Sequence, residues 1–178
     1  MTSRACPQKT REVRASAPVQ AFVSAGSNVD PAKHIRMAVG GLRERFGPLR
    51  VSAVYRSRAA GFEGDDFLNL VIGFRTGERP QAIVAELERL HEEAGRSRGA
   101  NPFSPRTLDL DLLLYGDQVI DDVQVPRPDI TRYSFVLGPL AELAPGQRHP
   151  VTGETMAEMW QRFDKASHPL QRLPISVL

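Results

Sequence analysis

The chain has 178 residues, of which 41% are hydrophobic and 25% are charged. This composition is typical of one soluble globular domain with a sizeable core. No run approaches the roughly 18 apolar residues of a membrane-spanning helix, and the N-terminus lacks the apolar core of a signal peptide. The single cysteine, Cys6, excludes an intrachain disulfide and a cysteine-based zinc cluster, so we expect a cytoplasmic protein without a membrane partner.

The formal net charge of +2 is unevenly distributed. Residues 1–19 carry a net charge of +3, so the rest of the chain carries −1. A nearly neutral folded part argues against a nucleic-acid partner. We expect a disordered basic tail over 1–19, a single domain over 20–168 and a loosely attached tail over 169–178.

Hydrophobic periodicity and capping residues predict an alternation of strands and helices. In chain order the expected elements are a strand over 20–25, a helix from Asp30-Pro31 to Gly47-Pro48, a strand over 49–56, a strand over 67–74, a helix from Pro80 to Gly95 and a strand over 107–115. This order is the ferredoxin-like βαββαβ pattern of an α+β fold, with helices on one face of an antiparallel sheet. The open face is where chemistry can take place. Beyond it we expect a hairpin over 118–125 and short helices over 135–143 and 154–163.

Two carboxylates alternate with leucines in the last of these strands. Alternation turns the leucines toward a core and places Thr107, Asp109 and Asp111 on the other face. The two carboxylates would lie roughly 7 Å apart and repel each other unless a cation neutralises them. A surface strand with solvated aspartates is one interpretation. The preceding segment, 96–106, carries three arginines and no acid, which favours a site for Mg²⁺ and phosphates.

Several motifs extend this interpretation to most of the chain. They are Gly26-Ser27-Asn28, Phe67-Leu68-Asn69, the run Pro-Arg-Thr-Leu-Asp-Leu-Asp over 105–111, Val125-Pro126, and the run Phe-Val-Leu-Gly-Pro-Leu over 135–140. With them the chain resembles the 6-hydroxymethyl-7,8-dihydropterin pyrophosphokinase family over about residues 20–163, as a divergent member. The resemblance implies Mg²⁺-dependent transfer of pyrophosphate from ATP, the co-substrate, to a reduced pterin, giving AMP and a pterin diphosphate in folate biosynthesis.

The resemblance also implies which residues form the site. Asp109 and Asp111 match aspartates that bind two Mg²⁺ ions. Phe67 and Phe135 match the aromatic pair that sandwiches the pterin, and Asn69 matches an amide that reads the pterin edge. Arg96 and Arg106 match catalytic arginines that contact the triphosphate. Further residues near the nucleotide are matched by His91, Arg98, Arg127 and Arg132.

Simpler roles remain open for some of these residues. Phe135, on an apolar helix, could belong to the core, and Asn69 could satisfy a hydrogen bond of its strand. Arg98 could be solvated.

Four departures from the family pattern leave a second function open. His91 replaces a glutamate, Phe103-Ser104 replaces Trp-Gly, Arg127 replaces a histidine and Tyr133 replaces an arginine. The alternative is a catalytically altered paralogue that binds a pterin or nucleotide as a regulatory module. An RNA-binding domain is a third class, but its aromatic strand signature is missing. We expect a monomer that acts on small molecules.

Overall fold

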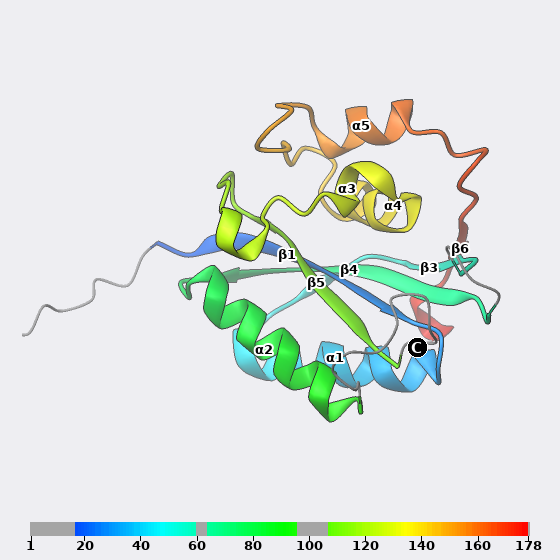
Figure 1. The fold of residues 1–178 in the computed structure, drawn as a ribbon, viewed down its shortest axis with the longest axis horizontal. Coiled ribbons are helices and arrows are strands. Elements are labelled where there is room, and N and C mark those ends of the chain that lie inside the picture. The colour runs from blue at the N-terminus through cyan, green and yellow to red at the C-terminus, as the bar shows by residue number, and fades with distance from the viewer. Residues whose placement is uncertain (1–16, 60–63, 96–106, 178) are drawn as a thin grey trace, which may run out of the picture.

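The computed structural model describes residues 17–59, 64–95 and 107–177. Within these ranges an antiparallel sheet lies between two layers of helices (Figure 1). The long helices α1 (Pro31–Phe46) and α2 (Pro80–Glu93) cover one face. The ferredoxin-like order predicted from the sequence is confirmed, and three short helices cover part of the opposite face. None of the helices in the described ranges combines the length and hydropathy that crossing a bilayer requires.

The sheet brings together strands from both ends of the chain. Its strands are β1 (Val19–Ser27), β2 (Arg50–Val51), β3 (Val54–Ser57), β4 (Phe67–Thr76), β5 (Asp109–Tyr115) and β6 (Gln171–Leu173). They run in the order β5-β1-β4-β3-β6, and β2 also pairs with β4. The single strand expected over 49–56 is divided because the Ser52 hydroxyl accepts a hydrogen bond from the Val71 N–H at 3.0 Å. A side chain thus replaces one backbone contact of the ladder.

The first core lies between the sheet and the two long helices. Pro31 stands at the start of α1, where a missing N–H is harmless, and Ile35, Ala38 and Leu42 form its buried stripe. Gly41 allows α1 to approach α2, because a Cβ at this position would lie 2.5 Å from a methyl group of Leu90. Burial of each large side chain here contributes about 1.5–3 kcal/mol.

The second core lies on the opposite face, under α3 (Asp129–Arg132), α4 (Ser134–Leu143) and α5 (Met156–Arg162). From the sheet it contains Phe22, Val71 and Leu113, which pack with apolar residues of the three helices. α5 begins with a capping box, in which Thr155 and Glu158 satisfy each other's backbone N–H groups. The candidate site lies on the same face of the sheet, two residues before Val71 in β4 and two residues before Leu113 in β5.

Two features of the chain after β5 differ from the expectation. Within the segment expected to be a loosely attached tail, β6 pairs with β3 and extends the sheet. The hairpin expected over 118–125 is reduced to one bridge, between Ile120 and Val125, around the short 3-10 helix η1 (Asp121–Val123). A second 3-10 helix, η2, spans Ile175–Val177.

A polar network ties β6 to the rest of the fold. The Tyr55 hydroxyl donates to Glu142 Oε2 at 2.8 Å, and Arg172 of β6 donates to Glu142 Oε1 at 2.7 Å. Burial and the hydrogen bond to Glu142 raise the pKa of Tyr55 to about 12. Burial also raises the pKa of Glu142, but hydrogen bonds from Arg172 and Tyr55 outweigh that effect and keep it below its usual value.

Tyr55→Phe should therefore lower the free energy of unfolding by about 1.5–3 kcal/mol at pH 8, the scale of one hydrogen bond to a charged group. The pKa of Tyr55 in the folded protein lies above its ordinary value of 10.0. Its contribution is thus complete below pH 10 and is lost as the pH rises from 10 through about 12. Urea denaturation across this range should show the difference between the two proteins shrinking. A difference that stays constant up to pH 12 would contradict this assignment.

Candidate active site

The cross-strand register brings one predicted pterin residue and one predicted metal residue into a single row. Gly26 of β1 lies opposite Asn69 of β4 on one side and opposite Asp109 of β5 on the other. Tyr55 of β3 lies opposite Asn69 and completes the row. Residues directly opposite in antiparallel strands point to the same face. Asn69 and Asp109 thus share a face with only a glycine between them.

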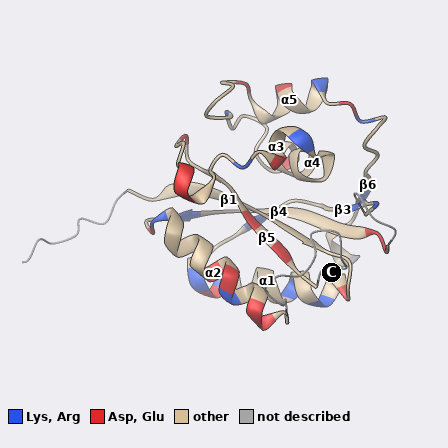
Figure 2. Ribbon diagram, in the orientation of Figure 1, with Lys and Arg blue, Asp and Glu red and all other residues tan. Residues whose placement is uncertain are grey.

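A second row lies beside the first and carries the other carboxylate. Ser24 of β1 lies between Val71 and Asp111. Val71 belongs to the core under α4 and α5, which identifies the face that the two rows share. Figure 2 shows the acidic residues of β5 as red segments of the strand. Asp109 and Asp111 lie on this face, as predicted, whereas Leu110 and Leu112 lie in the core under α1 and α2. Leu114, which the alternation placed with them, instead packs in the second core, because the pairing of β5 with β1 shifts register there.

Gly26 leaves a shallow surface that Asn69 and Phe67 border. A Cβ at Gly26 would lie 3.0 Å from Asn69 Oδ1 and 3.9 Å from Phe67 Cδ1. The Asn69 amide nitrogen donates to Ser57 Oγ at 3.0 Å and, at 3.4 Å, to the Tyr55 carbonyl. No described residue donates a hydrogen bond to Oδ1. The amide is therefore fixed on its nitrogen side, and its carbonyl oxygen is directed over the glycine as an acceptor.

An aromatic pair stands at the start of α4. The rings of Tyr133 and Phe135 are stacked, with centroids 5.0 Å apart and planes 17° apart. Both side chains are partly buried against the second core. Because α4 packs on β3 and β4 over the face that carries Phe67, aromatic side chains border this face from two elements. The Tyr133 stack was not part of the expectation.

Arg127 contacts one of the two site carboxylates. Its Nη2 lies 2.9 Å from Asp111 Oδ1, and its Nε lies 3.0 Å from Asp129 Oδ2. Sequence reasoning expected Arg127 near the nucleotide but assigned no role to Asp129. The residue follows Val125-Pro126, and no local pattern indicates that its partner is 16 positions earlier in the chain.

His91 lies in the other layer of the molecule. Its ring is 4% exposed, and Nε2 accepts a hydrogen bond from the Leu110 N–H at 2.7 Å. The other ring nitrogen, Nδ1, lies 3.5 Å from Glu88 Oε1. β5 is an edge strand, so His91 supplies an acceptor for one of its outward N–H groups. This contact accounts for the burial of His91, and its nucleotide-binding role stays a prediction.

The remaining predicted residues fall into two groups. Arg132 is exposed at the end of α3. The loop arginines, and the residues that replace Trp-Gly, lie outside the described residues; they are Arg96, Arg98, Arg106, Phe103 and Ser104. Their predicted roles remain predictions. Gly26 and Ser24 are the site positions that sequence reasoning missed, because only the strand register reveals them.

The donor set of the site suits Mg²⁺. Asp109 and Asp111 offer hard carboxylate oxygens about two strand residues, or roughly 7 Å, apart. In the described parts of the chain no three histidine, cysteine, aspartate or glutamate residues gather into a metal-binding cluster. Mg²⁺ commonly binds one or two carboxylates together with substrate phosphates and water, so two aspartates suffice.

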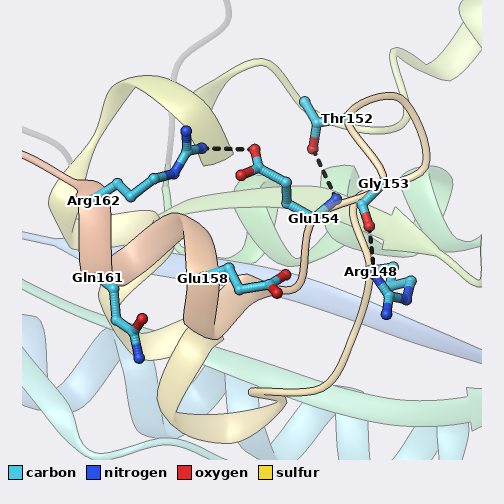
Figure 3. A pocket seen from close by; sticks show the side chains of 7 residues that line it. All are labelled: Arg148, Thr152, Gly153, Glu154, Glu158, Gln161 and Arg162. Carbon is cyan, nitrogen blue, oxygen red and sulfur yellow. Dashed lines mark hydrogen bonds and ion pairs between the residues drawn. The ribbon is translucent and has the colours of Figure 1, made fainter.

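A separate pocket lies on the outer side of the helical layer. It has a volume of about 490 Å³ and is formed by α5 and the loop before it (Figure 3). Arg162 pairs with Glu154 at 2.6 Å, and Arg148 donates to the Gly153 carbonyl at 2.7 Å. None of the predicted site residues lines this pocket. Its charged side chains are bonded to one another, to the backbone or to Thr155, so we assign it no part in the site.

The sequence and the fold are similar to those of known proteins. A sequence model of the family described as 7,8-dihydro-6-hydroxymethylpterin-pyrophosphokinase matches residues 22–145. Over 141 residues the chain is 34% identical to the 2-amino-4-hydroxy-6-hydroxymethyldihydropteridine pyrophosphokinase of Aquifex aeolicus, which covers 77% of this chain and 88% of the relative. The chain belongs to this pyrophosphokinase family. The resemblance inferred from the sequence motifs is thereby confirmed.

Other relatives agree with this membership. The pyrophosphokinase of the same name from Pseudomonas aeruginosa is 37% identical over 136 residues, covering 72% of this chain and 83% of that protein. Among solved structures, the Plasmodium falciparum HPPK-DHPS with pterin and p-hydroxybenzoate matches with a TM-score of 0.67 and 14% identity. That match covers 82% of this chain and 43% of the longer Plasmodium chain. At this identity it supports the pyrophosphokinase fold and nothing finer.

Proposed function

We propose that this chain transfers the β- and γ-phosphoryl groups of ATP together to the hydroxymethyl oxygen of 6-hydroxymethyl-7,8-dihydropterin. The pterin hydroxyl loses its proton as its oxygen bonds to the β-phosphorus, and the bond from that phosphorus to the oxygen of the α-phosphate breaks. The products are AMP and the pterin diphosphate of folate biosynthesis. Family membership supports this reaction, and the observation that carries it within the molecule is the row that joins Asn69, Gly26 and Asp109.

The pterin would lie over Gly26. The Asn69 carbonyl oxygen, directed over this glycine, suits the N–H donors along one edge of a pterin. Phe67 borders the same surface, and Phe135 is partly buried against the second core at the start of α4. We expect these two rings to hold the flat bicyclic substrate by stacking. The hydroxymethyl group would then point across β1 toward the carboxylates of β5.

The nucleotide would lie beside the pterin, over β5. Asp109 and Asp111 would hold two Mg²⁺ ions, which neutralise the charge that develops on the phosphate oxygens during an in-line displacement. Arg127 is a described cation in contact with this strand, and its planar guanidinium can bind two phosphate oxygens at once. We expect Arg96, Arg98 and Arg106, from the segment that precedes β5 in the chain, to contact the triphosphate as well.

Measurement of AMP tests this function. Purified protein with ATP and Mg²⁺ should form AMP only when the hydroxymethyl pterin is added, and removal of Mg²⁺ with EDTA should abolish the reaction. The alternative, a regulatory paralogue, predicts pterin or nucleotide binding without AMP formation. The relatives reported above are named as enzymes, which favours catalysis. A cytoplasmic location and a monomeric state remain predictions.

A further inference from the structure

Arg127 joins two carboxylates at the edge of the candidate site. Its guanidinium contacts Asp111 through Nη2 and Asp129 through Nε, at 2.9 and 3.0 Å. The three side chains are 27–30% exposed, so water screens the pair with Asp111 only in part. One oxygen of a predicted metal ligand is therefore in contact with a cation of the protein itself.

The backbone fixes Arg127 in this position. Its N–H donates to the Leu113 carbonyl of β5 at 2.9 Å, and its carbonyl accepts from the Ile130 N–H at 3.2 Å. Leu113 is two residues beyond Asp111 on the same strand, so the backbone of Arg127 is bonded to the strand whose carboxylate its side chain contacts. Asp129, in the first turn of α3, holds the Nε side of the guanidinium. The contact with Asp111 is thus supported from two sides.

We propose that Arg127 is a counter-ion that competes with the divalent cation for Asp111 and thereby makes cation binding depend on the nucleotide. The inference rests on the proposed function, because it needs Asp109 and Asp111 to be the cation ligands. A divalent cation at Asp111 would add two positive charges beside the guanidinium, which is unfavourable at this short distance. The phosphates of a nucleotide remove the conflict, since they offer the guanidinium another bidentate partner.

Thermodynamic linkage gives this proposal a measurable form. If the nucleotide releases Asp111 from Arg127, nucleotide and cation must each increase the other's affinity by the same factor. Loss of the Arg127 charge should strengthen binding of the cation alone. The same change should reduce the factor by which the nucleotide improves cation binding.

The experiment uses Mn²⁺ alone as the probe and follows free Mn²⁺ by electron paramagnetic resonance, with and without a non-hydrolysable ATP analogue. Arg127→Gln should bind Mn²⁺ alone about tenfold more tightly than the wild type. The factor by which the ATP analogue improves Mn²⁺ binding should be smaller by a similar amount. Arg162→Gln is the matched control, because it removes an arginine of equal charge from a 2.6 Å pair with Glu154 outside the site. Its Mn²⁺ affinity and its coupling should equal those of the wild type.

Each outcome has a defined meaning. If Arg127→Gln and the wild type bind Mn²⁺ alone with equal affinity, the proposal is overturned. The metal assignment still stands in that case if Asp109→Asn abolishes Mn²⁺ binding in the presence of the analogue. If Asp109→Asn has no effect on Mn²⁺ binding under any condition, the metal assignment of the proposed function fails instead. Should Arg127→Gln not fold, Arg127→Met replaces it. Methionine also removes the charge and keeps an unbranched side chain, so tighter binding of Mn²⁺ alone supports the proposal and wild-type affinity overturns it.

Discussion

Asp109→Asn and Asp111→Asn should each lower the rate of AMP formation at least about a hundredfold, or about 2.7 kcal/mol of transition-state stabilisation. Each change removes one negative charge from the face that would hold the Mg²⁺ ions while it preserves the size of the side chain. Both side chains are only partly buried, so the fold should remain intact. Initial rates at saturating Mg²⁺, ATP and pterin measure the effect.

A nearby acidic residue provides the control for these two variants. Asp117 lies in the turn after β5 and is exposed, so Asp117→Asn changes the net charge equally without touching the site. It should keep the wild-type rate. Asp111→Asn also removes a partner of Arg127, which should cost no more than about 1 kcal/mol of unfolding free energy at a half-exposed pair. A wild-type rate in either site variant would reject the metal assignment.

Gly26→Ala should raise the KM for the pterin at least tenfold while the affinity for an ATP analogue stays near the wild-type value. The added methyl group would lie 3.0 Å from Asn69 Oδ1, closer than side chains normally approach, so the amide must move. Displacing a substrate-positioning group by a fraction of an ångström has large effects on binding and rate. The described atoms within 4 Å of the new methyl group belong to Asn69 and Phe67, so the carboxylates should be spared.

Gly40→Ala is the matched control for this variant. No described atom lies within 4 Å of a Cβ at Gly40, which is in α1 on the other side of the sheet. The change should stabilise the helix by up to about 1 kcal/mol and leave the KM for the pterin unchanged. An unchanged KM in Gly26→Ala, too, would mean that the pterin does not bind over this glycine.

Alternation along single strands was sufficient to predict which site residues share one face of the sheet. In β5 Asp109 and Asp111 lie on the face opposite Leu110 and Leu112, as expected, and in β4 the same period places Phe67 and Asn69 on one face. These conclusions need only the period of two residues that every strand has. Membership of the pyrophosphokinase family was also recognisable from short motifs, above all the run that ends in Asp111.

Features that depend on pairing between distant segments were not predictable in this way. Gly26 lies between Asn69 and Asp109 because of the register of three strands, and a shift of one residue would turn it to the other face. The ion pair of Arg127 with Asp111 likewise requires that the chain return to β5 after the turn. β6 is three residues long and largely exposed, so its sequence lacks the apolar alternation that marks a strand.

The most direct test of pyrophosphoryl transfer is a ³¹P NMR time course of the purified protein with ATP, Mg²⁺ and 6-hydroxymethyl-7,8-dihydropterin. If the β- and γ-phosphoryl groups leave ATP together, AMP and pterin diphosphate appear in equal amounts, no ADP accumulates, and Asp109→Asn stops both signals from growing. Accumulation of ADP, or AMP that forms equally fast without the pterin, would contradict the account.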